Sequence, residues 1–386
     1  MMENRILFET TGDFELGLIK ERETDYFIYN SEYNDGLIVY IPGFGGDLGD
    51  YAKNFCSSVS RKYRLASLMV NYFCIGSRPQ TGATINIYPE DNAKLQQSFM
   101  DLGGHGEASL EALGKLLLNN HQGLKSELRL RGVLTPPKGE YQNFGIMAAL
   151  DVINAIKDAV RRFKINQDQI VIVGSSYGGY VANLVTKIYP GLVKAVFDNS
   201  AWANPNILYA IGAELGISEY IADLHPKLSI DLNVKSPWTL KAGLPNSFSG
   251  GRLEIRSFSK PQLSRMHEQG GKDTFYVFYH AEGDLIAITE EKITMAQNMV
   301  ELGFKHIMMN VVNESEIDGK LIKNMSHGMG MSMLTFFDGC FQFLQDVNPA
   351  FKFNDDIEQA VYEMDDFVYR FDLTGNFATG VVLPQG

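Results

Sequence analysis

Cysteine is scarce in this sequence. Three cysteines, Cys56, Cys74 and Cys340, are spread over 386 residues without a closely spaced pair. This spacing excludes a disulfide framework and a cysteine-based zinc site, so we expect three buried thiols in a reducing compartment.

Long apolar runs are also missing. No stretch approaches the ~20 consecutive apolar residues of a transmembrane helix, and residues 1–5 lead straight into a polar, alternating segment. We therefore expect neither a membrane span nor a secretory signal peptide. Together with the reduced cysteines, this predicts a cytoplasmic protein.

Positive charge is in deficit. Lys and Arg number 34 against 46 Asp and Glu, which gives a formal net charge of −12. This balance argues against binding to nucleic acid. The sequence has no HExxH motif and no closely spaced His, Asp and Cys cluster, so we expect no metal and no other cofactor. None of these features predicts an oligomeric state.

What the sequence does contain is an alternation of apolar strands and amphipathic helices. Hydrophobic residues make up 45% of it, enough for a large core. Short antiparallel strands are expected first, at 6–9, 14–18 and 26–29. Six later runs are apolar on both faces, as buried strands of a parallel sheet are: 37–41, 65–70, 170–173, 194–197, 274–279 and 307–312. With helical spacing between them, they predict an α/β fold whose mostly parallel central sheet carries helices on both faces.

Length alone suggests two or three domains, at ~150 residues per domain. The strand–helix alternation instead assigns residues 1–346 to one core domain. Two stretches, 71–145 and 201–272, interrupt it and contain helical segments, so we expect helical cap insertions there. Residues 347–386 form a C-terminal extension, predicted as a β-hairpin with its turn at 372–377 and packed on the same domain.

The clearest chemical motif lies at residues 174–178 (GSSYG) and fits G-x-S-x-G. It follows an apolar run and opens a helical segment, which is the strand–turn–helix setting of a nucleophile elbow. A sharp turn strains the serine backbone, requires nearby glycines, exposes the hydroxyl and directs helix N–H groups at a developing oxyanion. Ser176 is the candidate nucleophile. Ser175 is the neighbouring alternative, but it does not have a glycine two residues away on both sides.

A serine nucleophile needs a general base and a group that orients the base. In chains with this elbow the order is Ser, acid, His, with the acid and the histidine placed after late strands. Asp284 follows the run 274–279, and His327, the last histidine, lies in a loop after 307–312. We expect Asp284 and His327 to complete a triad with Ser176.

Residues 41–46 (IPGFGG) directly follow an apolar run. Their glycines allow a backbone N–H to approach a substrate closely, so the N–H of Phe44 or Gly45 and that of Tyr177 are expected to form an oxyanion hole. A dinucleotide-binding loop is the competing interpretation. Its third glycine comes one position late for G-x-G-x-x-G, and residues 69–71 (MVN) offer no acid about 20 residues further on.

Four residues are candidates for substrate binding. Tyr72 and Trp202, with Phe44 and Tyr177, flank the expected pocket, where an aromatic residue can equally be lid packing or a substrate platform. Gly45, in the loop at 41–46, is the third candidate. Arg78 follows the run 65–70 and could meet an anionic group, with an ordinary surface arginine as the alternative.

With these motifs, the chain resembles the α/β-hydrolase superfamily of serine hydrolases over about residues 20–346. The resemblance implies roles for five residues: Ser176 as nucleophile, His327 as base, Asp284 as its partner, and the backbone of Phe44 and Tyr177 as oxyanion hole. Pro42 stands where lipases and esterases usually carry a histidine.

Two other carboxylates remain alternative acids. Glu282 lies in the same loop as Asp284, and Asp198 ends the run 194–197, a strand from which some α/β-hydrolases take their acid. His280 is expected to pack at a strand end, and His306 precedes its strand at the wrong edge of the sheet for catalysis.

Within the superfamily, the chain is similar to a poorly characterised group of bacterial proteins, some encoded among flagellar sugar-modification genes. Three segments carry this likeness: 40–47 (YIPGFGGD), 71–76 (NYFCIG) and 141–145 (YQNFG). The likeness implies acyl-group chemistry on a surface glycan or its sugar precursor.

The expected reaction is therefore ester cleavage through an acyl-enzyme, by an esterase or deacylase acting on a small molecule or a glycan ester. An acyltransferase or a peptidase would use the same triad, and the sequence does not choose the acceptor. The alternative from another class is a non-catalytic binding protein that keeps the elbow for structural reasons. The intact set of Ser176, Asp284 and His327 counts against it.

Overall fold

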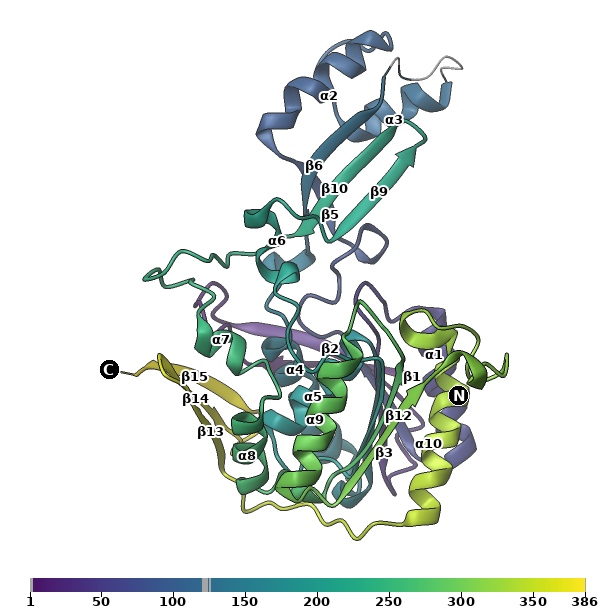
Figure 1. Ribbon diagram of the computed structural model, residues 1–386, viewed down its shortest axis with the longest axis vertical. Helices are drawn as coiled ribbons and strands as arrows, with labels where there is room; N and C mark the ends of the chain where they lie inside the picture. The colour runs from purple at the N-terminus through teal and green to yellow at the C-terminus, as the bar shows by residue number, and fades with distance from the viewer. Residues whose placement is uncertain (1–2, 120–123, 125, 386) are drawn as a thin grey trace. The chain divides into compact units, whose positions relative to one another are not determined.

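Most of the chain folds around one large sheet. The computed structural model describes residues 3–119, 124 and 126–385, and the chain divides into two units (Figure 1). The first unit takes in Met1–Ile75, Asn143–Pro205 and Lys241–Gly386, and the second Gly76–Gln142 and Asn206–Leu240. The expected insertion at 201–272 is thus divided between the units.

The eight strands of the large sheet lie in the order β1-β2-β4-β3-β7-β8-β11-β12. The two pairings β1–β2 and β2–β4 are antiparallel, and the rest are parallel. The strand bounds are β1 Glu3–Thr10, β2 Arg22–Tyr29, β3 Leu37–Ile41, β4 Ala66–Val70, β7 Ile170–Ser175, β8 Ala195–Asn199, β11 Phe275–Ala281 and β12 His306–Val312. This is the α/β-hydrolase fold, as predicted.

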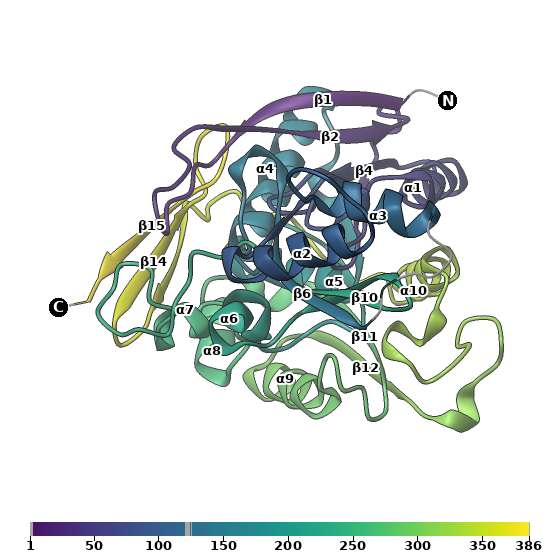
Figure 2. The same cartoon turned by 90° about the horizontal axis from the view of Figure 1, so that it is seen from above.

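Helices cover both faces of this sheet. α1 (Asp50–Tyr63) and α10 (Met333–Val347) pack on one face, where Phe55 and Phe337 share a buried cluster with Val171 and Val277. α4 (Ile146–Phe163), α5 (Tyr177–Ile188) and α9 (Thr289–Leu302) cover the other face (Figure 2). Two shorter helices, α7 (Gly250–Glu254) and α8 (Lys260–Glu268), precede β11.

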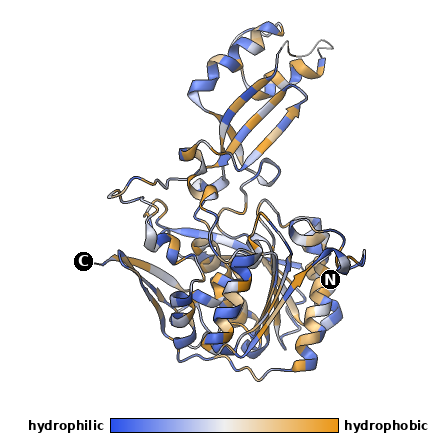
Figure 3. Ribbon diagram, in the orientation of Figure 1, coloured by the Kyte–Doolittle hydropathy of each residue, from blue (hydrophilic) through white to orange (hydrophobic). Residues whose placement is uncertain are grey.

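The second unit contains helical segments, as predicted for the insertions, but also a sheet that was not predicted. It contains a four-stranded sheet in the order β5-β6-β10-β9, in which only β6–β10 is a parallel pair. The alternating burial along β6 marks a sheet with one buried face, and Figure 3 shows the matching alternation of apolar and polar residues. Its elements are β5 Thr84–Ile87, α2 Pro89–Asp101, α3 Leu110–Asn119, β6 Leu128–Thr135, α6 Leu208–Leu215, β9 Tyr220–His225 and β10 Leu228–Val234.

The two ends of the chain differ in detail from their predictions. The strand expected at 14–18 is wrong: the carboxylate of Asp13 accepts the backbone N–H groups of Glu15, Leu16 and Leu18 and holds a turn there. The C-terminal hairpin is present as β14 (Phe367–Asp372) and β15 (Thr379–Pro384), and a third strand, β13 (Gln359–Glu363), extends it into a sheet.

Cys56, Cys74 and Cys340 are all buried free thiols, as predicted. Among the residues that the structure describes, no helix combines the length and the apolar character needed to cross a membrane.

Candidate active site

The turn between β7 and α5 forces Ser176 into an unusual backbone conformation. Its φ of 54° and ψ of −121° lie in a region that side chains rarely adopt. Glycines make this turn possible: a Cβ on Gly178 would lie 2.0 Å from the carbonyl oxygen of Ile41, and one on Gly174 2.3 Å from the carbonyl carbon of Gly178. The spacing of the motif is thus explained by close backbone approach.

Three predicted residues form a continuous hydrogen-bonded chain. His327 Nε2 lies 2.8 Å from Ser176 Oγ, and His327 Nδ1 lies 2.7 Å from Asp284 Oδ2. Both distances are those of good hydrogen bonds. The second bond requires the proton on Nδ1, because an ionised carboxylate only accepts, and this leaves Nε2 to accept from the serine hydroxyl.

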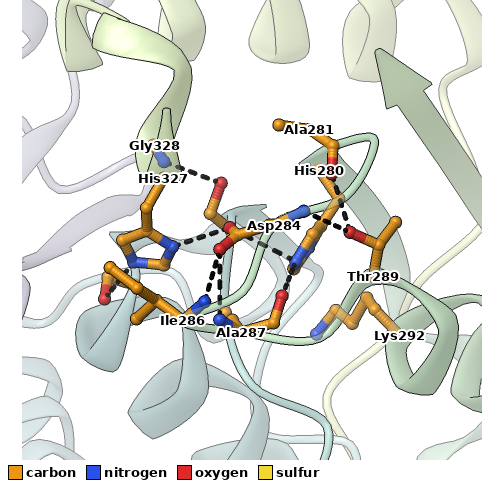
Figure 4. Close-up of polar contacts among 12 residues, drawn as sticks. His280, Ala281, Asp284, Ile286, Ala287, Thr289, Lys292, His327 and Gly328 are labelled. Atoms are coloured by element: carbon orange, nitrogen blue, oxygen red, sulfur yellow. Dashed lines mark hydrogen bonds and ion pairs between the residues drawn. The ribbon is translucent and has the colours of Figure 1, made fainter. Parts of the chain in front are cut away.

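Asp284 is held in its charged form by its surroundings. Burial alone would raise the pKa of this carboxyl, but the hydrogen bond and charge of His327 and the N–H groups of Ile286 and Ala287 outweigh burial. The pKa of Asp284 therefore lies below its usual range. The carboxylate is available at neutral pH to orient the imidazole (Figure 4).

Asp198, the alternative acid, has different partners. Its Oδ2 accepts from Lys292 Nζ at 2.6 Å and from Asn183 Nδ2 at 2.7 Å, and its Oδ1 accepts from the N–H of Ala201. Lys292 and Asp198 form a fully buried ion pair. This pair joins α9 to the end of β8 and does not involve the histidine.

The remaining competitors are also not members of this hydrogen-bonded chain, although His280 Nε2 lies 3.7 Å from Asp284 Oδ2. Glu282 is exposed, and its N–H donates to Val312. His280 is buried, with Nε2 2.6 Å from the carbonyl oxygen of Ala287, so it packs at the strand end as predicted. Ser175 is the last residue of β7 and pairs with Asn199 of β8.

Asn199 and Ser200 position the loop that carries His327. Asn199 Nδ2 donates to the carbonyl oxygen of Gly328 at 3.2 Å, and the N–H of Gly328 donates to Ser200 Oγ at 3.2 Å. Neither residue was predicted from the sequence. Their one signal was position: Asn199 ends β8 and Ser200 follows it, and β8 lies between β7 and β11 in the sheet.

The predicted oxyanion donors lie at the ends of two neighbouring strands. Tyr177 is the first residue of α5, and Phe44 follows β3, with the two rings 5.4 Å apart in an edge contact. Gly43 approaches the elbow closely, since a Cβ there would lie 3.1 Å from the carbonyl oxygen of Ser175. Gly45 has a φ of 75°, a conformation that favours glycine.

Two aromatic candidates for substrate binding have hydrogen-bonding roles inside the first unit. The Tyr72 hydroxyl donates to the carbonyl oxygen of Pro42 at 3.2 Å, which supports the loop before Phe44. Trp202 Nε1 donates to the carbonyl oxygen of Ile286 at 2.6 Å, and its ring centroid lies 6.3 Å from that of His327. Both side chains are buried, so packing is their evident contribution.

Arg78, the fourth candidate, belongs to the second unit. Its guanidinium donates to Glu219 Oε1 at 2.8 Å and lies over the ring of Tyr220. It is buried, so the surface arginine considered from the sequence is not what the structure has.

Phe144 is a further residue near the proposed site that was not predicted from the sequence. Its φ is 56°, and its ring packs 5.6 Å from that of Tyr177 and 5.8 Å from that of Trp202. It lies in the YQNFG segment at 141–145, which was the available signal.

A model of the family described as "Protein of unknown function (DUF2920)" matches residues 8–378. The chain belongs to this family. No curated protein sequence matches it.

Solved structures with a similar backbone to this DUF2920 chain are distant in sequence. The acylaminoacyl peptidase of Pyrococcus horikoshii is 13% identical with a TM-score of 0.44, over 89% of this chain and 41% of that one. A lipase/esterase from Lactobacillus plantarum is 9% identical with a TM-score of 0.45, over 91% and 100%. A thermostable esterase from Pseudomonas putida is 11% identical with a TM-score of 0.43, over 90% and 81%. The chain thus spans less than half of the peptidase.

Proposed function

We propose that this protein is a serine hydrolase that cleaves carboxylic esters through an acyl-enzyme. The observation that carries the proposal is the hydrogen-bonded chain from Ser176 Oγ through His327 to Asp284. A strained serine at a helix N-terminus, with a base in contact and a buried carboxylate behind the base, is what nucleophilic catalysis requires.

In the first half of the proposed reaction, Ser176 Oγ attacks the ester carbonyl while His327 Nε2 takes its proton. The bond from Oγ to the carbonyl carbon forms, and the bond to the alcohol oxygen breaks. His327 returns the proton to the departing alcohol. Asp284, ionised and fixed by backbone N–H groups, stabilises the imidazolium between these steps.

The negative charge that develops on the carbonyl oxygen is assigned to the N–H groups of Phe44 and Tyr177. Each such donor is worth about 3 kcal/mol of barrier in known hydrolases. Water then attacks the acyl-enzyme with His327 as base, which releases the acid and restores Ser176. Transfer to another hydroxyl, or cleavage of an amide, would use the same groups.

The first test is labelling by a fluorophosphonate probe, which reacts with an activated serine. We expect the wild-type protein to be labelled and Ser176→Ala to be inert. Ser175→Ala is the matched control and should keep the label, because Ser175 is the other hydroxyl of the same turn. A folded wild-type protein that resists the probe would refute the proposal and favour the non-catalytic binding protein.

The substrate panel follows from the sequence resemblance. Acylated sugars represent the glycan chemistry implied by the flagellar sugar-modification group, and p-nitrophenyl esters represent simple esters. An amide series tests for a peptidase, and an added alcohol acceptor reveals acyl transfer. We expect release of free acid from esters as the main activity, measured by product analysis.

A further inference from the structure

The loop that carries Asp284 presents three aliphatic side chains to solvent. Leu285 is 88% exposed, Ile286 48% and Ile288 38%, while Ala287 between them is buried. A single exposed leucine is ordinary, but three exposed aliphatic residues within four positions form a patch. We call Leu285, Ile286 and Ile288 the acid-loop patch.

The backbone beneath the acid-loop patch is held firmly. The N–H groups of Ile286 and Ala287 donate to Asp284 Oδ1 at 2.9 and 3.2 Å. The carbonyl oxygen of Ile286 accepts from Trp202 Nε1 at 2.6 Å, and that of Ala287 lies 2.6 Å from His280 Nε2. These bonds hold the backbone of Ile286 and Ala287 at the centre of the patch, so the Ile286 side chain is preorganised for contact.

Ile286 brings the acid-loop patch close to the proposed reacting atoms. Ile286 is two residues from Asp284, and it shares a hydrogen bond with Trp202, whose ring lies 6.3 Å from that of His327. Figure 4 shows Ile286 on the side of Asp284 on which His327 lies. A substrate bound with its carbonyl at Ser176 would have one of its two ends near this loop.

The chemistry of the acid-loop patch favours one kind of substrate. The side chains of residues 285–288 contain no hydrogen-bonding group. A sugar ring placed on them would lose water from its hydroxyls without gaining partners. An alkyl or aryl group would remove apolar surface from water on both partners, which is favourable.

We propose that the natural substrate is an ester whose alkyl or aryl group binds to the acid-loop patch. If that group belongs to the acyl part of the ester, the acyl part is larger than acetyl. This rests on the proposed function, since it names the substrate class of the same site. The apolar group can belong to the acid or to the alcohol of the ester. Both present the same chemistry to the loop, and two substrate series tell them apart.

The experiment measures kcat/KM of the full chain on two series of esters. One series lengthens the acyl group of p-nitrophenyl esters from acetyl to octanoyl, and the other lengthens the alcohol of acetate esters from ethyl to octyl, with phenyl acetate included. We expect kcat/KM to rise about tenfold or more along one series, as apolar contacts of a few methylenes allow. The series that rises identifies the end of the substrate on the patch.

Two variants test whether the acid-loop patch causes the increase in kcat/KM with chain length. Leu285→Asn and Ile286→Asn remove apolar contact but keep the backbone bonds to Asp284 and Trp202. In each variant the ratio of kcat/KM between the longest and the shortest ester of the rising series should fall by about fivefold. Ile286→Val should keep the rise. Val300→Asn is the matched control, because Val300 is 60% exposed on α9, and its profile should equal that of the wild type.

Failure of this inference is distinguishable from failure of the proposed function. If the wild type takes up the fluorophosphonate but both ester series are flat, or acetylated sugars are the best substrates, the apolar substrate class is overturned and the serine hydrolase stands. If the rise persists in both Asn variants, the patch does not cause it and the inference also falls. If the wild type takes up no probe, both proposals fail together.

Discussion

Asp284 and Asp198 are buried carboxylates at the ends of neighbouring strands, and their partners separate them. Asp284 faces an imidazole that is 18% exposed, whereas Asp198 faces the fully buried ammonium of Lys292. A carboxylate that neutralises a buried cation has a structural role, because its removal leaves the cation without a counter-charge. A carboxylate that holds a histidine in contact with a serine is the arrangement that we propose for catalysis.

Substitution by asparagine should separate these two residues. Asp284→Asn is expected to lower kcat by about 10⁴, because the amide no longer fixes the tautomer of His327 or stabilises its charged form. Asp198→Asn leaves Lys292 without its counter-charge and should cost about 3–5 kcal/mol of stability. Its kcat, measured per probe-labelled molecule, should stay near the wild-type value.

Initial rates measure kcat of both variants, and urea unfolding measures their free energy of unfolding. A large loss of kcat in Asp198→Asn, with Asp284→Asn active, would reverse the assignment of the acid.

The G-x-S-x-G motif predicted Ser176, and the order of residues along the chain then favoured Asp284 and His327. Sequence order preferred Asp284 but left Asp198 as an alternative acid. The choice depends on Lys292, which lies 94 positions from Asp198 and on another element. Asn199 and Ser200 were missed for the same reason, since their contacts with Gly328 join segments that are distant in sequence.

At the scale of elements, the β7–α5 turn depends on the backbone of β3. The Cα of Gly178 faces the carbonyl group of Ile41, the last residue of β3, so closely that a side chain would not fit. Gly174 is packed in the same way against the backbone of the first turn of α5. The turn can therefore form only where no side chain separates the strand from the helix. Conversely, a glycine in open space carries no such requirement.

Gly178→Ala should be severely destabilising, because its Cβ would lie 2.0 Å from a backbone oxygen that cannot move freely. We expect loss of probe labelling together with a lower thermal midpoint. Gly114→Ala in α3 is the matched control: no atom lies within 4 Å of the added Cβ, and alanine should stabilise the helix by about 1 kcal/mol. Thermal unfolding followed by circular dichroism compares the two, and an unchanged midpoint in Gly178→Ala would contradict the argument.

Elements with strong periodicity were predictable, and those decided by a single side chain were not. The strands of the parallel sheet and the long helices between them are confirmed, because continuous apolar runs and helical spacing reflect burial directly. The run at 307–312 is the exception in burial, since β12 lies at the edge of the sheet and is mostly half-buried. The supposed strand at 14–18 failed, since the carboxylate of Asp13 satisfies the N–H groups that a neighbouring strand would need. The sheet in the second unit was missed although Leu and Arg alternate at 128–131.

At the scale of the whole first unit, one buried ion pair joins the two ends of the chain to the core. Arg256 donates to Glu15 Oε2 at 2.6 Å and to the carbonyl oxygen of Asn143, and the Tyr369 hydroxyl donates to Glu15 Oε1 at 2.5 Å. Burial alone would raise the pKa of Glu15, but Arg256, with Tyr369 and Asn143, outweighs burial and holds it below its ordinary value. The residue after Asn143 is Phe144, which packs beside Tyr177, so the C-terminal sheet is tied to the proposed site.

This ion pair predicts a specific pH dependence. Glu15→Gln should lower stability at pH 7 by about 3–5 kcal/mol, because Arg256 stays buried without its partner. A carboxylate with a depressed pKa stabilises the fold above its ordinary pKa, 4.5, and loses that contribution as the pH falls toward the lowered value. The gap between wild type and variant should therefore shrink below about pH 4.5.

Urea unfolding at a series of pH values measures this gap. Tyr369→Phe is the matched control, since it removes one hydrogen bond and keeps the ion pair, and it should cost only about 1–2 kcal/mol. A gap that stays constant down to pH 3 would show that the charge of Glu15 does not stabilise the fold.

The interleaving of the two units has a consequence for biosynthesis. In the sheet of the second unit, β10 pairs with β6 in parallel, and Leu228 lies opposite Leu128. The ribosome synthesises β7, the elbow and β8 after β6 and before β10. During this time β6 has no β10 to pair with, while part of the first unit has already been made. Pairing across such a separation is slow to form, and the exposed edge of β6 is then open to wrong partners. Nascent chains halted before residue 228 should therefore be the form of this protein that chaperones hold longest.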